Sequence, residues 1–319
     1  MQRFPTLPKV SELLRLYNLR ARSQLGQNFI LDLNVAQRIV DNAGGITGKY
    51  VCEIGPGPGS LTRCILLQEP RCLTVIEKDS RFLPMLDQLG SYSDNLLVVR
   101  QGDVLKYDLQ KEFTGVVPLV RWKDEICFLH LIGNLPFNIS LPLLVKFLKQ
   151  ISYRTGPFKF GRTPMTLIFQ EEVGLRIVAP PYSPHRSRLS VIVQAYCDAE
   201  LVYRIPSTVY VPRPKVNAAT VHFKPLIKPR ISVDFEVLDL VLRSLFNQKR
   251  SSIRKSLNLL FPEDQELREE ILKSTGINTS LRISCLTLED INNICIGCLP
   301  HLNRSENVKT VESHNLSHF

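Results

Sequence analysis

Long apolar runs are missing from this sequence. No stretch approaches the roughly 18 consecutive apolar residues that a membrane-spanning helix needs, and the apolar core of a secretory signal is also missing. The sequence contains neither an internal repeat nor a low-complexity tract. We therefore expect a soluble intracellular protein with no membrane partner.

The sequence also lacks cysteines and histidines at the spacing of a metal site. The eight cysteines are scattered, and several stand within apolar runs, as Cys127 does, which is typical of reduced and buried thiols. Cys295 and Cys298 form a C-x-x-C pair, but no second pair of cysteines or histidines stands at the spacing of a zinc site. No metal is expected, and the two thiols are predicted to share one face of a helix.

Acidic residues are outnumbered by basic ones. The 319 residues include 40 Lys and Arg against 30 Asp and Glu, which gives a formal net charge of +10. An excess of this size favours a polyanionic partner, above all nucleic acid, although charge alone also fits mere solubility. Apolar residues make up 44% of the chain, so a folded core is expected, and the length fits a catalytic domain with one appendage.

What is present is the pattern of an α/β domain. Between Lys49 and about Leu226, short apolar runs alternate with helix-length segments, which is typical of a sheet with crossover helices. The spacing predicts that the first four strands are parallel and that the last two form an antiparallel pair at one edge. The seven predicted strands are Tyr50 to Ile54, Leu73 to Glu77, Leu96 to Arg100, Cys127 to Gly133, Met165 to Gln170, Leu201 to Ile205 and Thr220 to Lys224.

The pattern becomes helical after Pro225 and Pro229. Helical periodicity occurs in Asp234 to Phe246, Ser252 to Leu260 and Leu286 to Leu299.

Residues 1–26 are rich in Arg and poor in acid, which fits an organelle-targeting segment and an ordinary N-terminal helix equally well. The predicted parts are a basic helical segment (1–26), an α/β domain (27–229), a helical domain (230–300) and a flexible tail (301–319).

A glycine-rich turn follows the first predicted strand and precedes a helix. It contains Gly55, Gly57 and Gly59. Glycine lets a ligand approach the backbone there, although such a turn alone also fits a dinucleotide enzyme or a tight connection. Glu77 ends the second strand, where a carboxylate can accept hydrogen bonds from ribose hydroxyls, and Asp103 with Val104 follows the third, where an adenine could be held. No Lys-Ser or Lys-Thr pair follows the turn, which excludes a P-loop and favours an adenosyl ligand.

The fourth predicted strand ends in Asn134, Leu135, Pro136 and Phe137, a pattern of the form Asn/Asp-x-Pro-aromatic. An adenine amine is a poor nucleophile because its lone pair is delocalised. The Asn134 side-chain oxygen and the Leu135 carbonyl could accept its two hydrogens and aim the lone pair at a methyl donor. No general base is then required, which fits the lack of an obvious catalytic His or carboxylate pair. Pro136 stiffens the turn, and Phe137 offers a face for stacking the base; the alternative is an Asn-Leu-Pro turn with a core Phe.

With these motifs the sequence resembles the ribosomal RNA adenine dimethyltransferases, within them the mitochondrial branch that also contains the mitochondrial transcription factor B proteins. The resemblance covers roughly residues 5 to 260. Its motifs are SQLGQNFILD from Ser23, EIGPGPGSLT from Glu53, VIEKD from Val75, QGDVL from Gln101, GNLPFNIS from Gly133, RLSVIVQAY from Arg188 and YVPRPKV from Tyr210. The implied fold is a Rossmann-like S-adenosylmethionine-dependent methyltransferase with a seven-stranded, mostly parallel sheet and a small all-helical C-terminal domain.

The resemblance also implies a set of site residues. Those implied to hold S-adenosylmethionine are Gln27, Asn28, Ile30, Gly55, Gly57, Glu77, Lys78, Asp103, Val104 and Asn134. Tyr210 is implied to sandwich the flipped adenine against Phe137. The family usually has Phe at this position, so the phenol of Tyr210 needs a polar partner or water. Pro58 resembles the ribosome-assembly members, so the expected substrate is two adjacent adenines in the 3′-terminal helix loop of small-subunit rRNA, each methylated twice.

The helical domain is expected to hold the RNA. Five cations fall in a run without acid between Arg243 and Leu260, and a polyanion would compensate them, although a solvated helix face is the ordinary alternative. They are Arg243, Lys249, Arg250, Arg254 and Lys255. By resemblance, the partner is small-subunit rRNA or the assembling subunit, with the mitochondrial transcription machinery as a further candidate, and the protein is a monomer of the mitochondrial matrix.

Two other functions fit parts of the pattern. A transcription accessory factor could keep the fold and bind nucleic acid without catalysis. An adenine methyltransferase acting on DNA would favour Pro at the position of Leu135. The intact Asn134 and Phe137 favour the RNA-methylating enzyme.

Overall fold

The computed structural model describes residues 8–247, 253–262 and 264–302. The chain divides into two compact units, one made of residues up to 174 with 199–227, and the other of 175–198 with residues from 228 onward. The last change of unit, after Ile227, lies close to the predicted domain boundary at residue 229. Residues 175–198, which we placed in the α/β domain, group instead with the helical unit.

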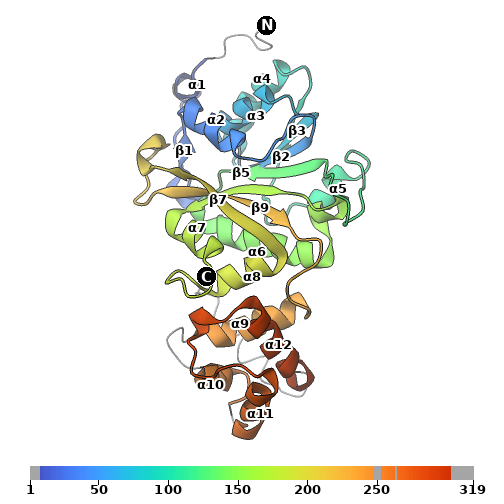
Figure 1. Cartoon of the computed structure of the whole chain (residues 1–319). Helices are drawn as coiled ribbons and strands as arrows, with labels where there is room; N and C mark the ends of the chain where they lie inside the picture. The colour runs from blue at the N-terminus through green and yellow to red at the C-terminus, as the bar shows by residue number, and fades with distance from the viewer. Residues whose placement is uncertain (1–7, 248–252, 263, 303–319) are drawn as a thin grey trace. The chain divides into compact units, whose positions relative to one another are not determined.

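The first unit is built on a seven-stranded sheet with the order β4-β3-β2-β5-β6-β9-β7 (Figure 1). The five strands from β4 to β6 are parallel, and β9 runs antiparallel to β6. The strands are β2 (Tyr50–Ile54), β3 (Cys72–Glu77), β4 (Leu97–Gln101), β5 (Leu129–Gly133), β6 (Met165–Gln170), β7 (Cys197–Ile205) and β9 (Ala218–Pro225). The predicted seven-stranded, mostly parallel sheet is confirmed, and its last two strands are neighbours at one edge.

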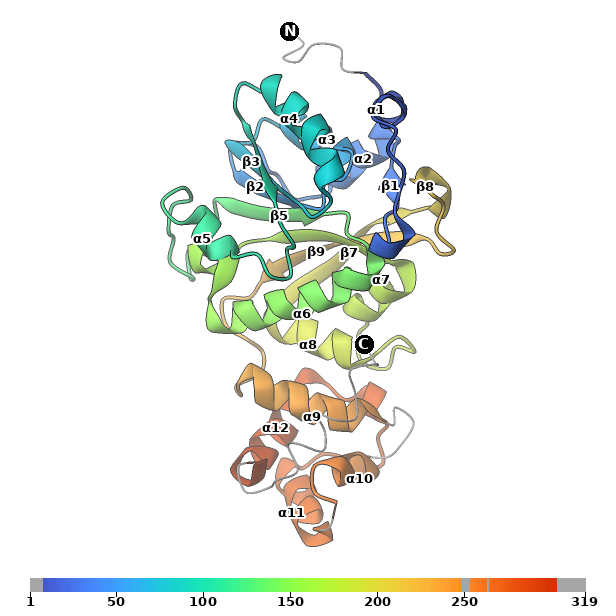
Figure 2. The ribbon, with the colours of Figure 1, turned by 180° about the vertical axis from the view of Figure 1, so that it is seen from behind.

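Helices cover both faces of this sheet, which explains why its central strands are buried almost throughout. Helices α2 (Leu33–Asp41), α3 (Ser60–Leu67) and α4 (Leu83–Ser91) lie on one face, and α6 (Phe137–Tyr153) lies on the other (Figure 2). Side-chain caps begin several of these segments, as where the Asp32 carboxylate accepts a bond from the Asn34 amide. The short helix α5 (Leu109–Phe113) follows β4.

A second, two-stranded sheet pairs distant parts of the first unit. Strand β1 (Phe29–Ile30) runs antiparallel to β8 (Tyr210–Val211), so that Ile30 lies opposite Tyr210. The N-terminal helix α1 (Val10–Leu16) also belongs to this unit, because Leu13 is part of its core and the Arg63 guanidinium donates to the Pro8 carbonyl. This two-stranded sheet was not predicted, because strands of two residues leave no periodic signal in the sequence.

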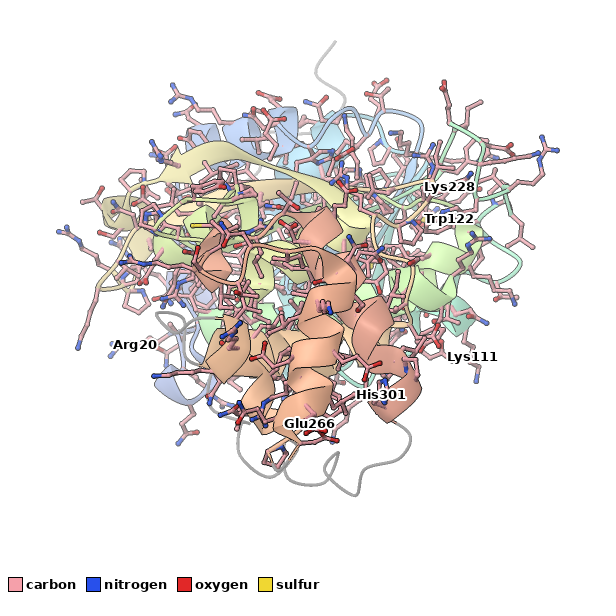
Figure 3. The ribbon with its side chains drawn as sticks, turned by 60° about the horizontal axis from the view of Figure 1, so that its bottom comes forward. Arg20, Lys111, Trp122, Lys228, Glu266 and His301 are labelled. Atoms are coloured by element: carbon pink, nitrogen blue, oxygen red, sulfur yellow. The ribbon has the colours of Figure 1, made fainter. Side chains whose placement is uncertain are left out.

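The second unit is helical. It contains α8 (Arg188–Tyr196), α9 (Phe235–Asn247), α10 (Ile253–Ser256), α11 (Gln265–Thr275) and α12 (Leu288–Leu302), while α7 (Glu171–Val178) crosses the boundary between the units. Contacts of α8 with α9 and α12 explain why residues 175–198 belong here. Cys295 and Cys298 of α12 are buried free thiols, which confirms their shared helical face. In Figure 3, His301 marks the end of α12 and Glu266 the first turn of α11, a helix not predicted from the sequence.

Among residues 8–247, 253–262 and 264–302, no helix is long and apolar enough to cross a membrane. The same part of the chain holds no group of three or more His, Cys, Asp or Glu residues that could bind a metal ion.

Candidate active site

The predicted cofactor motifs meet at one edge of the sheet. Gly55 follows β2, Glu77 ends β3, Asp103 follows β4 and Asn134 follows β5, and these four parallel strands are neighbours. A cavity of about 140 Å³ opens at their carboxyl ends. Its lining consists of Gln24, Leu25, Gln27, Ile54, Gly55, Ile76, Glu77, Lys78, Gly102, Asp103, Val104, Leu135, Pro136, Asn138 and Ile139.

Only some of the predicted cofactor and catalytic residues line this cavity. The cofactor residues that line it are Gln27, Gly55, Glu77, Lys78, Asp103 and Val104. Leu135 and Pro136 of the catalytic motif line it as well. The predicted residues outside this lining are Asn28, Ile30, Gly57, Asn134, Phe137 and Tyr210. Of these, Ile30 is buried in β1, and Gly57 acts through its backbone.

Glu77 ties the glycine-rich turn to the end of β3. Its buried carboxylate accepts bonds from the Gly57 amide at 2.9 Å and the Asp79 amide at 2.7 Å. Burial raises the pKa of Glu77, and these backbone hydrogen bonds oppose that shift. Each oxygen keeps a further lone pair, so the carboxylate can still accept hydrogen bonds from a ligand's hydroxyls.

Close backbone packing is needed beside this carboxylate. Gly57 has a positive φ of 52°, and a Cβ there would lie 3.2 Å from the Phe29 ring. Gly133, at the end of β5, is tighter, because a Cβ would lie 2.9 Å from the Ile54 carbonyl oxygen. Larger residues would therefore push apart the strand ends that form the cavity.

Asp103 and Val104 belong to a loop that is held from two sides. The exposed Lys78 lies 2.8 Å from Asp103 and, as the leading cause, lowers the pKa of its carboxyl. The ammonium of Lys146, on α6, donates to the Val104 and Leu105 carbonyls at 3.0 Å each. Sequence reasoning missed Lys146, which belongs to no motif and reaches the loop from about 40 residues away.

Asp79 is a second residue that sequence reasoning missed. Its buried carboxylate accepts a 3.0 Å bond from Gln27 and pairs with Arg81 at 2.5 Å. The hydrogen bond from Arg81 is the largest of the effects that lower the pKa of Asp79 to about 2. This carboxylate therefore holds Gln27 at the cavity, and its sequence signal was the final Asp of VIEKD.

Glu53 lies inside β2, two residues before the glycine-rich turn. The residue is 1% exposed, and Thr62 at the start of α3 is close enough to donate hydrogen bonds to its carboxyl. Burial raises the pKa of Glu53 to about 8. Glu53 does not line the cavity, so its carboxyl supports the glycine-rich turn from within the sheet.

The Asn134 side chain is held by two groups outside its own motif. Its Nδ2 donates to the Asn28 carbonyl at 3.4 Å, and its Oδ1 accepts a 3.4 Å bond from the Tyr210 hydroxyl. The polar partner that the Tyr210 phenol was predicted to need is therefore Asn134. Tyr210 is only 2% exposed, so its ring presents no open stacking face, whereas Phe137 at the start of α6 is half-buried.

Comparison with known proteins identifies the family. The family model named ribosomal RNA adenine dimethylase matches residues 18–297. The chain belongs to this family. The mitochondrial dimethyladenosine transferase 1 of Xenopus tropicalis is 42% identical over 92% of this chain and 85% of its own, and that of Homo sapiens is 41% identical with the same coverage. The protein of the same name from Caenorhabditis elegans is 37% identical over 91% of this chain and 81% of its own.

Solved structures agree on the fold of this rRNA adenine dimethylase family member. A dimethyladenosine transferase from Plasmodium falciparum matches with a TM-score of 0.65 at 22% identity, covering 84% of this chain and 96% of its own. The 23S rRNA methyltransferase ErmE matches with a TM-score of 0.58 at 19% identity, covering 84% and 98%. The predicted Rossmann-like methyltransferase fold is therefore confirmed.

Two of the cations predicted to hold RNA have acidic partners that the sequence did not indicate. Arg243 pairs with Asp239 at 2.9 Å, and Arg254 with Glu269 at 3.2 Å. Both acids lie outside the run from Arg243 to Leu260, so the fold supplies counter-charges that the run lacks. Lys255 is exposed, while Lys249 and Arg250 lie outside the described residues.

Proposed function

We propose that this protein transfers methyl groups from S-adenosylmethionine to the N6 amines of two adjacent adenines in the 3′-terminal helix loop of mitochondrial small-subunit rRNA. Each adenine becomes N6,N6-dimethyladenosine, and the modification supports assembly of the small subunit. The observation that carries the proposal is the position of Asn134 and Leu135 at the end of β5, beside a cavity lined by Glu77 and Asp103.

The residues of the cavity fit the cofactor. Glu77 keeps lone pairs for the two ribose hydroxyls, and Asp103 with Val104 provides an acceptor and an apolar edge for adenine. When bound, S-adenosylmethionine supplies an electrophilic methyl group.

The chain's own part in the reaction is orientation. The Asn134 side-chain oxygen and the Leu135 carbonyl accept the hydrogens of the adenine amine, so its nitrogen becomes tetrahedral and its lone pair points at the methyl group. Phe137 stacks on the base at the mouth of the site. No side chain has to remove a proton before methyl transfer, because the amine loses its proton readily once alkylated.

The partner and the compartment are part of the proposal. Relatives about 40% identical over most of the chain are named mitochondrial dimethyladenosine transferase 1, which supports rRNA as substrate and the mitochondrion as location. Within the mitochondrion, the proposed compartment is the matrix, as the resemblance to the mitochondrial branch implies. All the proposed cofactor and catalytic residues lie in the first unit of one chain, which supports action as a monomer.

The test uses the purified protein, S-adenosylmethionine and small-subunit rRNA, either free or in an assembling particle. Nucleoside mass spectrometry should detect N6,N6-dimethyladenosine at two neighbouring positions. Asn134→Ala should remove most turnover while cofactor affinity stays within a few fold, whereas Asn34→Ala, an exposed change on α2, should leave both unchanged. Failure to form dimethyladenosine on either RNA substrate would refute the proposal, as would full activity of Asn134→Ala.

A further inference from the structure

The Tyr210 hydroxyl contacts the Asn134 side chain from outside the Asn-Leu-Pro-Phe motif. Tyr210 lies in β8, opposite Ile30 of β1, and Asn28 directly precedes β1. The Tyr210 hydroxyl of the two-stranded sheet and the Asn28 carbonyl just before it both contact the Asn134 amide. The sheet and the residue next to it therefore hold this side chain from two sides.

These two contacts distinguish the ends of the amide. The Asn28 carbonyl can only accept a hydrogen bond, so it selects Nδ2, while the phenol donates to Oδ1. A half-turn of the amide would place Oδ1 against the Asn28 carbonyl oxygen and break a hydrogen bond, so the contacts favour a single orientation. The oxygen has two lone pairs, and one stays free for a substrate hydrogen.

We propose that the Tyr210 hydroxyl is a positioning group that fixes the Asn134 amide with its oxygen toward the adenine amine. The inference rests on the proposed function, in which this oxygen accepts an N6 hydrogen. Without the phenol, the amide could turn and present Nδ2, a donor that repels the amine's hydrogens. The hydroxyl is a reliable donor, because burial raises the pKa of Tyr210 and keeps it protonated.

The first test is Tyr210→Phe, which removes one oxygen and keeps the buried ring. We expect kcat to fall about tenfold through misorientation of the amide. The KM values for RNA and S-adenosylmethionine should stay within about twofold, because binding contacts are retained. Tyr17→Phe is the matched control, since its hydroxyl makes a 3.3 Å bond to Gln88 on the surface, and its kcat should be unchanged. Unchanged or higher turnover in Tyr210→Phe would overturn the inference, because a hydroxyl that merely obstructs the oxygen would raise turnover when removed.

A second test asks whether the hydroxyl acts through amide orientation. Asn134→Asp replaces the amide by a carboxylate with two equivalent oxygens, so turning the side chain over no longer changes which atom faces the substrate. In this background Tyr210→Phe should change turnover by less than about twofold. A tenfold loss of turnover on Tyr210→Phe in both backgrounds would overturn the orientation argument. If Asn134→Asp is too slow to measure, the effect of Tyr210→Phe on the chain with Asn134 decides whether the inference stands. If Asn134→Ala abolishes turnover and Tyr210→Phe does not reduce it, this inference fails while the proposed function stands.

Discussion

The ammonium of Lys146 lies 3.0 Å from the carbonyl oxygen of Val104. It also donates to the carbonyls of Leu105 and Tyr107, at 3.0 and 3.4 Å. Lys146 is on α6, the helix that begins at Phe137, whereas Val104 lines the proposed adenine end of the cofactor site. One side chain thus connects the helix that would stack the substrate base with the loop that would hold the cofactor.

Replacing Lys146 should weaken cofactor binding. Lys146→Met keeps the aliphatic stem but removes three hydrogen bonds to the loop, so Asp103 and Val104 are no longer held in a fixed position. We expect the Kd of S-adenosylmethionine to rise about tenfold, measured by calorimetry. Lys106→Met is the control, because Lys106 is exposed on the same loop, and its Kd should match that of the parent. Equal affinity in Lys146→Met would show that the loop holds its shape alone.

Removing the Glu77 carboxylate should affect cofactor binding more than fold. Glu77→Ala removes the proposed ribose acceptor and frees the Gly57 and Asp79 amides. We expect the affinity for S-adenosylmethionine to fall by roughly tenfold or more, as measured by calorimetry. Glu125→Ala, an exposed change in the same unit, should bind normally. Unchanged affinity in Glu77→Ala would refute the ribose assignment.

The strand-end motifs could be predicted because they are local. Gly55, Glu77, Asp103 and Asn134 each follow or end an apolar run, and parallel strands place such residues at a common edge. The contact of Tyr210 with Asn134 could not be predicted, because 76 residues separate the two and their meeting depends on a two-stranded sheet too short to leave a pattern.

The helical part shows a similar limit. Helices α9 and α12 were predicted because their apolar residues repeat at helical spacing. Helix α11 (Gln265–Thr275) was missed because it is dominated by charged residues and buries only Ile271 and Leu272. Residues 175–198 follow an α/β pattern in sequence, but the Arg188 guanidinium pairs with Asp239 of α9, a contact that no local pattern indicates.

A pair of buried histidines should make the fold sensitive to acid. His130 and His222 are each 3.0 Å from the Thr166 hydroxyl, and their rings stack at 5.8 Å. Burial lowers the pKa of His222 to about 4 and that of His130 well below its usual range. Both are therefore neutral when folded, whereas the unfolded chain takes up protons near pH 6.5.

The free energy of unfolding should consequently fall as the pH drops from about 6.5 toward 4, by up to about 1.4 kcal/mol per pH unit for each histidine. Urea unfolding at several pH values measures this slope. His222→Gln keeps a hydrogen-bonding side chain but cannot titrate, so its slope should be smaller. His185→Gln, an exposed change, should leave the slope as it is. An identical slope in His222→Gln would assign the acid sensitivity to other groups.

The basic run of the helical unit should contribute to RNA affinity by neutralising phosphates. Arg254 pairs with Glu269 at the surface, where an ion pair contributes little, so its guanidinium can still exchange that partner for a phosphate. Replacing Arg250, Arg254 and Lys255 together by Gln should reduce the slope of log affinity against log salt by roughly two to three, near one for each phosphate that is no longer neutralised. The measurement is binding of the small-subunit hairpin over a range of salt concentrations.

The control for this prediction removes the same charge elsewhere. Lys111, Arg121 and Lys123 are exposed on the first unit and belong to no predicted RNA surface. Replacing them by Gln lowers the net charge by the same three units, so a purely long-range effect of charge would change both slopes alike. Direct phosphate binding predicts a smaller slope for the helical variant only. If the helical variant keeps the parent's slope, the run is a solvated face and the RNA lies elsewhere on the protein.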